Sequence, residues 1–215
     1  AAAERLLAQA LVFVGAVSSA HRHAAAALGI ARSIGDRSSI AESEATLAWT
    51  RFWVGRGVRI DLLDAARSSP AWSCYAPQEA TPDIMAGILL CWSDQVTPAR
   101  AMLLAEDRRL TELGQDRPRA LVQYTLAELE CRAGDLAAAL RHVEEGLAAA
   151  ELVGDEFHRS LLICTRGLIA ARRGCHDDAR ADAERAAPLG VEIGTTVTSS
   201  FAASRISSAY VPIFP

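Results

Sequence analysis

Glycine recurs at intervals of 20 residues along this 215-residue chain, and this spacing limits its fold more than any other feature. One run comprises Gly15, Gly35 and Gly55, and a second comprises Gly114, Gly134, Gly154, Gly174 and Gly194, with a slip of one residue between the runs. Glycine readily adopts the left-handed conformation that ends an α-helix. The spacing therefore predicts a series of helices of about 15 to 18 residues, which pair into a repeat of about 40 residues.

Small residues recur at matching positions of these helices. We name the helix that ends at Gly15, Gly55, Gly134 or Gly174 the A helix and the next one the B helix; Asp94 replaces the glycine in the third repeat. The A-helix column is Ala8, Ala48, Gly87, Ala127 and Gly167; twelve residues on stand Ala20, Ile60, Ala99, Ala139 and Ala179, and seven beyond those Ala27, Arg67, Glu106, Gly146 and Ala186. Small side chains in register let helix axes approach closely, so these columns predict that paired helices cross at these positions.

The ends of the predicted helices carry further signals. Aspartate follows Gly35, Gly134 and Gly154, where it can accept a free backbone N–H of the next helix. Ser39–Glu42 is a capping-box pattern, and Thr81 precedes a first-turn proline. An aliphatic column before the B-helix ends is expected to seal each turn against the next repeat: Ile34, Leu113, Val153 and Ile193.

The spacing of the small columns resembles the tetratricopeptide repeat, from Ala8 to about Ser207. The period is about 40 rather than about 34 residues, and the family's proline after helix B and its large aromatics in helix A are missing. The resemblance implies an all-α fold, a right-handed α-α superhelix (a solenoid) of five helix hairpins plus a partial eleventh helix. We expect one domain over residues 1–210, with an irregular loop at 68–80 and a tail at 211–215.

A second resemblance concerns composition. The stretch Pro118–Gly194, with phrases such as Cys131–Ala139 and Glu151–Asp155, is similar to the helical repeat regions of large LuxR-type ATPase transcription regulators. It implies an ATPase domain before this segment and a DNA-binding domain after it. The segment itself would then be a sensor and interaction module.

Composition narrows the classes of function. The net charge of −4 and a pI near 5.8 give no general attraction for nucleic acid. No apolar run reaches the length of a membrane span, and we see no secretion leader. The five cysteines include no C-x-x-C pair, which favours a reduced, cytoplasmic setting with buried thiols.

The sequence contains no catalytic motif that we recognise. It has no lysine, hence no phosphate-binding GxxxxGK, and neither HExxH nor GxSxG. The densest group of metal-ligand residue types is Cys175–Asp178, but adjacent residues on a helix point to different sides. We interpret it as an acid-rich helix start. We therefore expect no enzyme activity, no metal and no cofactor.

Candidate binding residues lie near the ends of the A helices. Two residues before each end stand Phe13, Trp53, Trp92, Arg132 and Arg172; one turn earlier stand Trp49, Ile88, Glu128 and Leu168, and a further turn back Ala45, Ile84, Tyr124 and Cys164. The resemblance to tetratricopeptide repeats implies that these positions line the concave face, where that family binds partners. We expect the binding residues to be Trp49, Trp53, Trp92, Tyr124, Glu128, Arg132 and Arg172, because aromatic rings supply contact area and arginine binds carboxylate or phosphate.

Two interpretations of these residues stay open. The tryptophans either bind a ligand or fill space in the distorted second repeat, and the arginines either bind anions or are solvated helix ends. The first functional hypothesis is a regulator module whose groove accepts an inducer or a partner protein segment. The alternative is a protein-interaction or oligomerisation scaffold, homo-oligomers included, without a small-molecule site.

Overall fold

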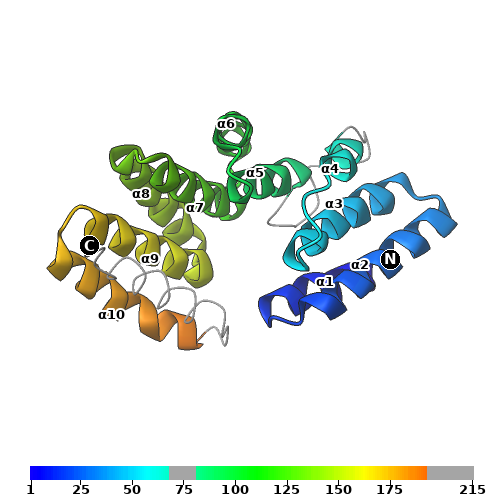
Figure 1. The fold of residues 1–215 in the computed structure, drawn as a ribbon, viewed down its shortest axis with the longest axis horizontal. Helices are drawn as coiled ribbons and strands as arrows, with labels where there is room; N and C mark the ends of the chain where they lie inside the picture. Colours follow the sequence, from blue (N-terminus) through cyan, green and yellow to red (C-terminus); the bar gives the residue numbers. More distant parts are fainter. Residues whose placement is uncertain (68–80, 193–215) are drawn as a thin grey trace, which may run out of the picture. The chain divides into compact units, whose positions relative to one another are not determined.

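The described part of the protein is entirely helical, as predicted. The structure is a computed structural model that describes residues 1–67 and 81–192, and these ranges contain no strand. The helices are α1 (Ala2–Phe13), α2 (Val17–Ile34), α3 (Arg37–Trp53), α4 (Ile60–Arg67), α5 (Pro82–Trp92), α6 (Val96–Glu112), α7 (Asp116–Ala133), α8 (Leu136–Val153), α9 (Glu156–Arg172) and α10 (His176–Glu192) (Figure 1). The predicted loop at 68–80, the partial eleventh helix and the tail at 211–215 lie outside the described residues.

The chain divides into two compact units, Ala1–Met102 and Leu103–Pro215. Consecutive helices pack on each other in both: α1 to α5 in the first unit, and α7 to α10 in the second. Each unit has its own apolar core, with Leu63 and Leu89 fully buried in the first and Leu162 in the second. The single repeat domain over residues 1–210 stays a prediction.

The glycine grid ends helices as expected. Every grid glycine in the described residues has a positive φ, between 63° and 87°. Asp94 takes the glycine's place with a φ of 58°, the one positive φ of a non-glycine residue that the described ranges contain. Seven helices have 17 or 18 residues. Helices α1, α4 and α5 are shorter, with 12, 8 and 11 residues. A second left-handed glycine, Gly57, delays the start of α4, and Pro82 fixes that of α5.

The helix starts confirm one expectation and correct another. Asp36, Asp135 and Asp155 each accept a backbone N–H in the first turn of the next helix, and Thr81 does so for α5. The capping box predicted at Ser39 is wrong. Helix α3 starts directly after Asp36, because this carboxylate satisfies the free N–H groups, and Ser39 therefore lies inside the first turn.

The small residues of these columns are buried wherever their side chains are described, whereas Arg67, which interrupts the third column, is exposed. All five A-helix positions are buried, and so are the B-helix positions Ala20, Ala99, Ala139 and Ala179, each with no exposed surface. The prediction that the aliphatic residues before the B-helix ends are covered by the next repeat is wrong for Ile34 and Leu113, which are 68% and 49% exposed. The left-handed turn follows these residues at once and takes the chain away before the next helix can cover them. Val153 is half-buried, and Ile193 lies outside the described residues.

Two hairpins contain an equivalent polar contact between their A and B helices, which supports an internal repeat. His23 Nδ1 lies 2.6 Å from Glu4 Oε2 in the first hairpin, and His142 Nδ1 lies 2.7 Å from Gln123 Oε1 in the fourth. Glu4 and Gln123 occupy the same A-helix position, eleven residues before the glycine, and the two histidines occupy the same B-helix position. The two hairpins therefore share one internal geometry although most of their residues differ.

Three A helices also carry a buried threonine nine residues before their end. Thr46, Thr125 and Thr165 are at most 4% exposed. Each hydroxyl donates to the backbone carbonyl four residues earlier, over 2.9 to 3.0 Å. The polar atom is therefore satisfied within its own helix.

Two helical glycines test whether close packing is the reason for the small columns. A Cβ added at Gly146 would lie 2.7 Å from a methyl carbon of Leu162 and 3.0 Å from Gln123 Cβ, whereas one at Gly29 would meet nothing within 4 Å. We expect Gly29→Ala to raise the free energy of unfolding by about 1 kcal/mol through helix propensity. Gly146→Ala should lower it by about 1 kcal/mol, because overpacking outweighs that gain. Urea unfolding measures both, and an equal gain in the two variants would contradict the packing argument.

Candidate functional site

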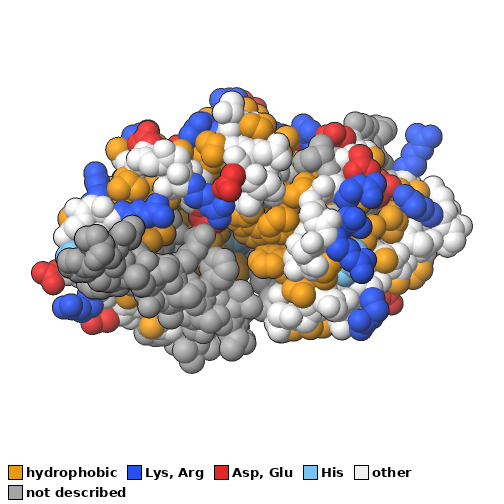
Figure 2. Space-filling view, in the orientation of Figure 1, with side chains coloured by type: hydrophobic (Ala, Val, Ile, Leu, Met, Phe, Trp, Pro, Cys, Tyr) orange, Lys and Arg blue, Asp and Glu red, His pale blue; other side chains and the backbone are white. Residues whose placement is uncertain are grey.

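Four aromatic rings from α3 and α5 form a cluster in the first unit. The ring of Trp92 is central: its centroid lies 5.5 Å from that of Trp49, 5.6 Å from that of Phe52 and 5.3 Å from that of Trp53. Phe52 stacks on it, and Trp53 meets it edge to face. On the face drawn in Figure 2, hydrophobic side chains gather over the ends of α3 and α5. The structure therefore brings together the three tryptophans that the sequence singled out, and adds Phe52.

The cluster has features of both packing and binding. Trp49 and Phe52 pack against the buried core of α3, α4 and α5, which fits the space-filling interpretation. All four rings are only half-buried, however. The Nε1 donor of Trp53 is shielded from solvent and has no hydrogen-bond acceptor among the described residues. A buried donor without an acceptor is unusual because it costs the full desolvation of the N–H.

The other four predicted residues belong to the second unit. Tyr124 and Glu128 are 7% and 3% exposed, so they lie in the packed interior of α7 rather than on an open wall. Arg132 and Arg172 are exposed at the ends of α7 and α9. Arg172 Nη1 donates to the backbone carbonyl of Cys131 over 2.6 Å, which ties the ends of these two A helices together. That all seven residues form a binding site stays a prediction.

A polar network links α6, α7 and α8 beside the buried Gln123. Its amide nitrogen donates to Asp107 over 2.8 Å and to Glu145 over 3.0 Å, so its oxygen is free to accept from His142. Arg119 donates to the same Asp107 over 3.0 Å. Burial lowers the pKa of His142, although the nearby carboxylates of Glu145, Glu130 and Asp107 oppose the shift. The imidazole is therefore neutral at pH 7 and acts as a structural hydrogen-bond donor.

This network predicts a loss of stability in mild acid. The folded state lowers the pKa of His142 below its ordinary value of 6.5, so the unfolded chain takes up a proton more readily as the pH falls below 6.5. The free energy of unfolding should therefore decrease from pH 7.5 to pH 5, and His142→Gln should reduce the slope. Urea unfolding at both pH values measures the difference. A wild-type slope that equals that of the variant would show that His142 does not contribute.

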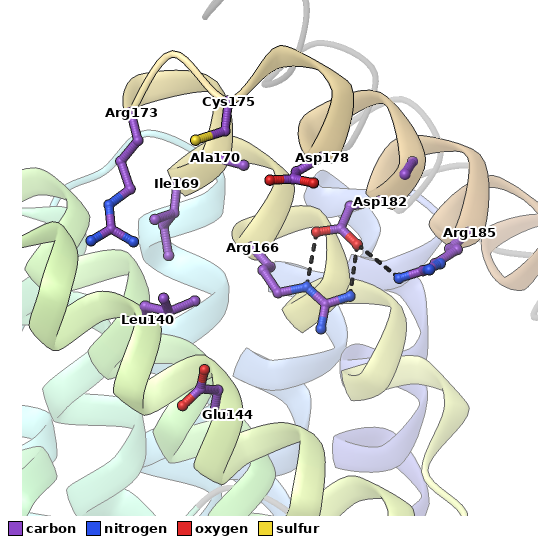
Figure 3. Close-up of a pocket in the computed structure, with 11 residues that line it drawn as sticks. Leu140, Glu144, Arg166, Ile169, Ala170, Arg173, Cys175, Asp178, Asp182 and Arg185 are labelled. Atoms are coloured by element: carbon purple, nitrogen blue, oxygen red, sulfur yellow. Dashed lines mark hydrogen bonds and ion pairs between the residues drawn. The ribbon is translucent and has the colours of Figure 1, made fainter.

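A cavity of about 370 Å³ opens between α8, α9 and α10 (Figure 3). Leu140, Ile169 and Ala170 supply its apolar wall. Across from them, Arg166 donates to both oxygens of the buried Asp182 over 2.8 and 2.6 Å. This bidentate hydrogen bond raises the pKa of Arg166, so its guanidinium is charged at neutral pH.

The rim of this cavity carries charge of both signs. Arg185 Nη1 lies 3.6 Å from the same Asp182, and Arg173, Glu144, Asp178 and the exposed thiol of Cys175 complete the lining. Such a space suits a small polar or zwitterionic group better than a purely apolar one. We did not predict this cavity. One signal exists in the sequence, since Arg166 occupies an A-helix position where the other repeats have Leu7, Leu47, Ala86 and Leu126.

Cys131 is buried and Cys164 is half-buried. Burial raises the pKa of Cys131 and of Cys164 to about 11, so both stay protonated at neutral pH. Asp177 and Asp178 lie in the first turn of α10, as the acid-rich helix start predicts. In residues 1–67 and 81–192, no three His, Cys, Asp or Glu side chains converge as metal ligands would. No helix of these ranges is long and apolar enough to cross a membrane.

Comparisons with known proteins add no identification. No protein-family model matches the chain, and no curated protein is significantly similar to it.

Two variants separate packing from binding in the aromatic cluster. Trp92→Ala removes the ring that the other three contact and should lower the free energy of unfolding by about 3 kcal/mol. Trp53→Phe keeps a ring but removes the buried donor, so it should change stability by less than about 1 kcal/mol. Thermal and urea unfolding measure both. If Trp53→Phe were as damaging as Trp92→Ala, the Nε1 group would have an essential structural role.

Proposed function

We propose that this chain is a non-catalytic helical-repeat module that binds a partner protein segment or a small-molecule inducer through its A helices. In this proposal the hairpins stack as a right-handed superhelix whose inner face carries the A helices. The module is the sensor and interaction part of a cytoplasmic bacterial transcription regulator and does not itself contact nucleic acid. The compositional likeness to LuxR-type regulators supports this assignment.

Contacts between helices support an inner face made of A helices. Within the units, α1 lies against α3, α3 against α5, and α7 against α9, and all of these are A helices. No pair of B helices in the described residues makes a comparable contact. A stack whose A helices are closer together than its B helices curves toward the A side, which is the geometry of a concave binding face.

The aromatic cluster is the observation that carries the proposal. Three of its rings come from the ends of the A helices at the positions selected from the sequence. The half-exposed rings offer a rigid apolar surface, and the Nε1 of Trp53, which is covered in this structure, can donate one hydrogen bond to a group that enters between the rings. The chemistry fits a flat or aliphatic group that bears a hydrogen-bond acceptor. In the second unit, Arg132 and Arg172 are exposed cations suited to carboxylate or phosphate.

A scaffold without a small-molecule site is the second candidate. Leu6 and Leu7 of α1 and Val14 directly after it expose 44% to 66% of their surface, and exposed apolar side chains of this size favour contact with another protein. In that case the aromatic cluster would have a purely structural role.

The dye 8-anilinonaphthalene-1-sulfonate tests the aromatic cluster, because it combines apolar rings with an anionic acceptor. We expect it to bind the native protein and to quench tryptophan emission by energy transfer. Trp53→Phe should weaken this binding about three- to tenfold, since one hydrogen bond contributes about 0.5 to 1.5 kcal/mol.

The matched control is Phe157→Leu, which alters a half-buried ring of the second unit and should leave the dissociation constant unchanged. Dye binding that is insensitive to Trp53→Phe, with no quenching of tryptophan, would show that the cluster only packs. Circular dichroism of both variants checks that the fold is intact.

A further inference from the structure

The cavity between α8, α9 and α10 is formed by the packing of three consecutive helices of the second unit. Its volume of about 370 Å³ lies at the lower end of the range of small-molecule sites. The lining residues run from Leu140 of α8 to Arg185 of α10. Each wall of this space is therefore a described helix.

One wall of the cavity is held in place by a buried ion pair. Asp182 is 5% exposed, and both of its carboxylate oxygens accept hydrogen bonds from Arg166, over 2.8 and 2.6 Å. Arg185 Nη1 approaches the same carboxylate to 3.6 Å. Asp182 is therefore already neutralised by arginines of the protein, and a charged ligand would have to find its partners elsewhere in the lining.

Arg173 and Asp178 are the lining residues whose charge is unused. In the part of the chain that the structure describes, neither side chain makes a hydrogen bond or an ion pair. Glu144 differs, because its carboxylate interacts electrostatically with Arg166. Figure 3 shows Arg173 on one side of the apolar Ile169 and Asp178 on the other. The cavity thus offers a cation at one side, a carboxylate at the other and an apolar surface between them.

The fifth hairpin carries charge in this cavity at positions that are apolar in the fourth hairpin. Arg166, Arg173 and Asp178 correspond to three residues that stand 40 positions earlier, Leu126, Ala133 and Ala138. The fourth hairpin packs with these uncharged side chains. The repeat itself therefore does not require the charges, and a role beyond packing accounts for them.

We propose that this cavity binds an extended zwitterion, a small molecule whose carboxylate and ammonium groups are separated by a methylene chain or a peptide unit. Arg173 would donate to the carboxylate, Asp178 would accept from the ammonium group, and the spacer would lie on Leu140 and Ile169. An α-amino acid fits poorly, because both of its charged groups are attached to one carbon atom and cannot reach both sides of the apolar wall. This site is separate from the aromatic cluster and does not rest on the function proposed for it.

The linear zwitterion 6-aminohexanoate is the probe. Its isomer norleucine is the matched control ligand, because it has the same atoms with both charges at one end, and hexanoate lacks the ammonium group altogether. Isothermal titration calorimetry with the full 215-residue chain measures each affinity. We expect saturable binding of 6-aminohexanoate, at least about tenfold tighter than that of norleucine or hexanoate, since each control loses one charge contact. Glycylglycine distinguishes the two sources of this chemistry, because a dipeptide site would prefer it to 6-aminohexanoate.

Variants of the chain locate the bound zwitterion. Arg173→Gln and Asp178→Asn should each weaken its binding at least about tenfold, and both should fold normally because both side chains are exposed. The matched control is Arg180→Gln, which changes an exposed arginine of α10 outside the cavity lining and should leave the dissociation constant unchanged. Circular dichroism checks the fold of all three variants.

Three results would overturn the proposal. The first is the absence of saturable binding of both 6-aminohexanoate and glycylglycine. The second is binding of norleucine or hexanoate that equals that of the tighter extended zwitterion. The third is an unchanged affinity in either Arg173→Gln or Asp178→Asn, because the zwitterion would then bind elsewhere or use other partners.

Discussion

Paired helices in this protein meet at residues that have almost no side chain, and the positions of all other groups follow from this close approach. Ala8, Ala20, Ala127 and Ala139 have no exposed surface, and side chains this small allow the backbones of paired helices to approach closely. At Gly146 even a methyl group exceeds the available space. The left-handed glycines act together with this contact: they reverse the chain within one or two residues, which brings consecutive helices back alongside each other.

The same constraint decides where polar groups can lie. Inside a hairpin, the pairs Glu4–His23 and Gln123–His142 use the same register, at which a long A-helix side chain reaches the B helix. The polar contact of the fifth hairpin lies at a different position: Arg166 reaches the buried Asp182 of α10, and a cavity lies beside the pair. In the third hairpin Trp92 ends α5 and its ring lies among those of α3. A common backbone spacing thus supports local sites of very different chemistry.

Much of the fold could be predicted from the sequence, because its determinants are local. A glycine's conformation and an aspartate cap depend on a few neighbouring residues, and the small columns repeat at fixed offsets. Whether a residue belongs to a binding surface depends on how deeply neighbouring elements bury it, and sequence periodicity does not reveal that burial. Tyr124 and Glu128 have the angular position expected of an open face, yet neighbouring elements bury them. Arg166 and Asp182 are 16 residues apart, and only the crossing of α9 and α10 brings them together. Ile34 is apolar but exposed, because the following turn moves the chain away.

The buried threonines of the A helices have a consequence for how such a chain grows. Thr46, Thr125 and Thr165 each satisfy their hydroxyl within their own helix, so an element that packs on them needs no matching polar group. A duplicated or deleted hairpin would leave no buried hydroxyl without a partner at the new junction. At such a junction the threonines would need no new partner, whereas the residues of contacts between hairpins, such as Arg5–Glu42 and Asp107–Gln123, would have to be matched.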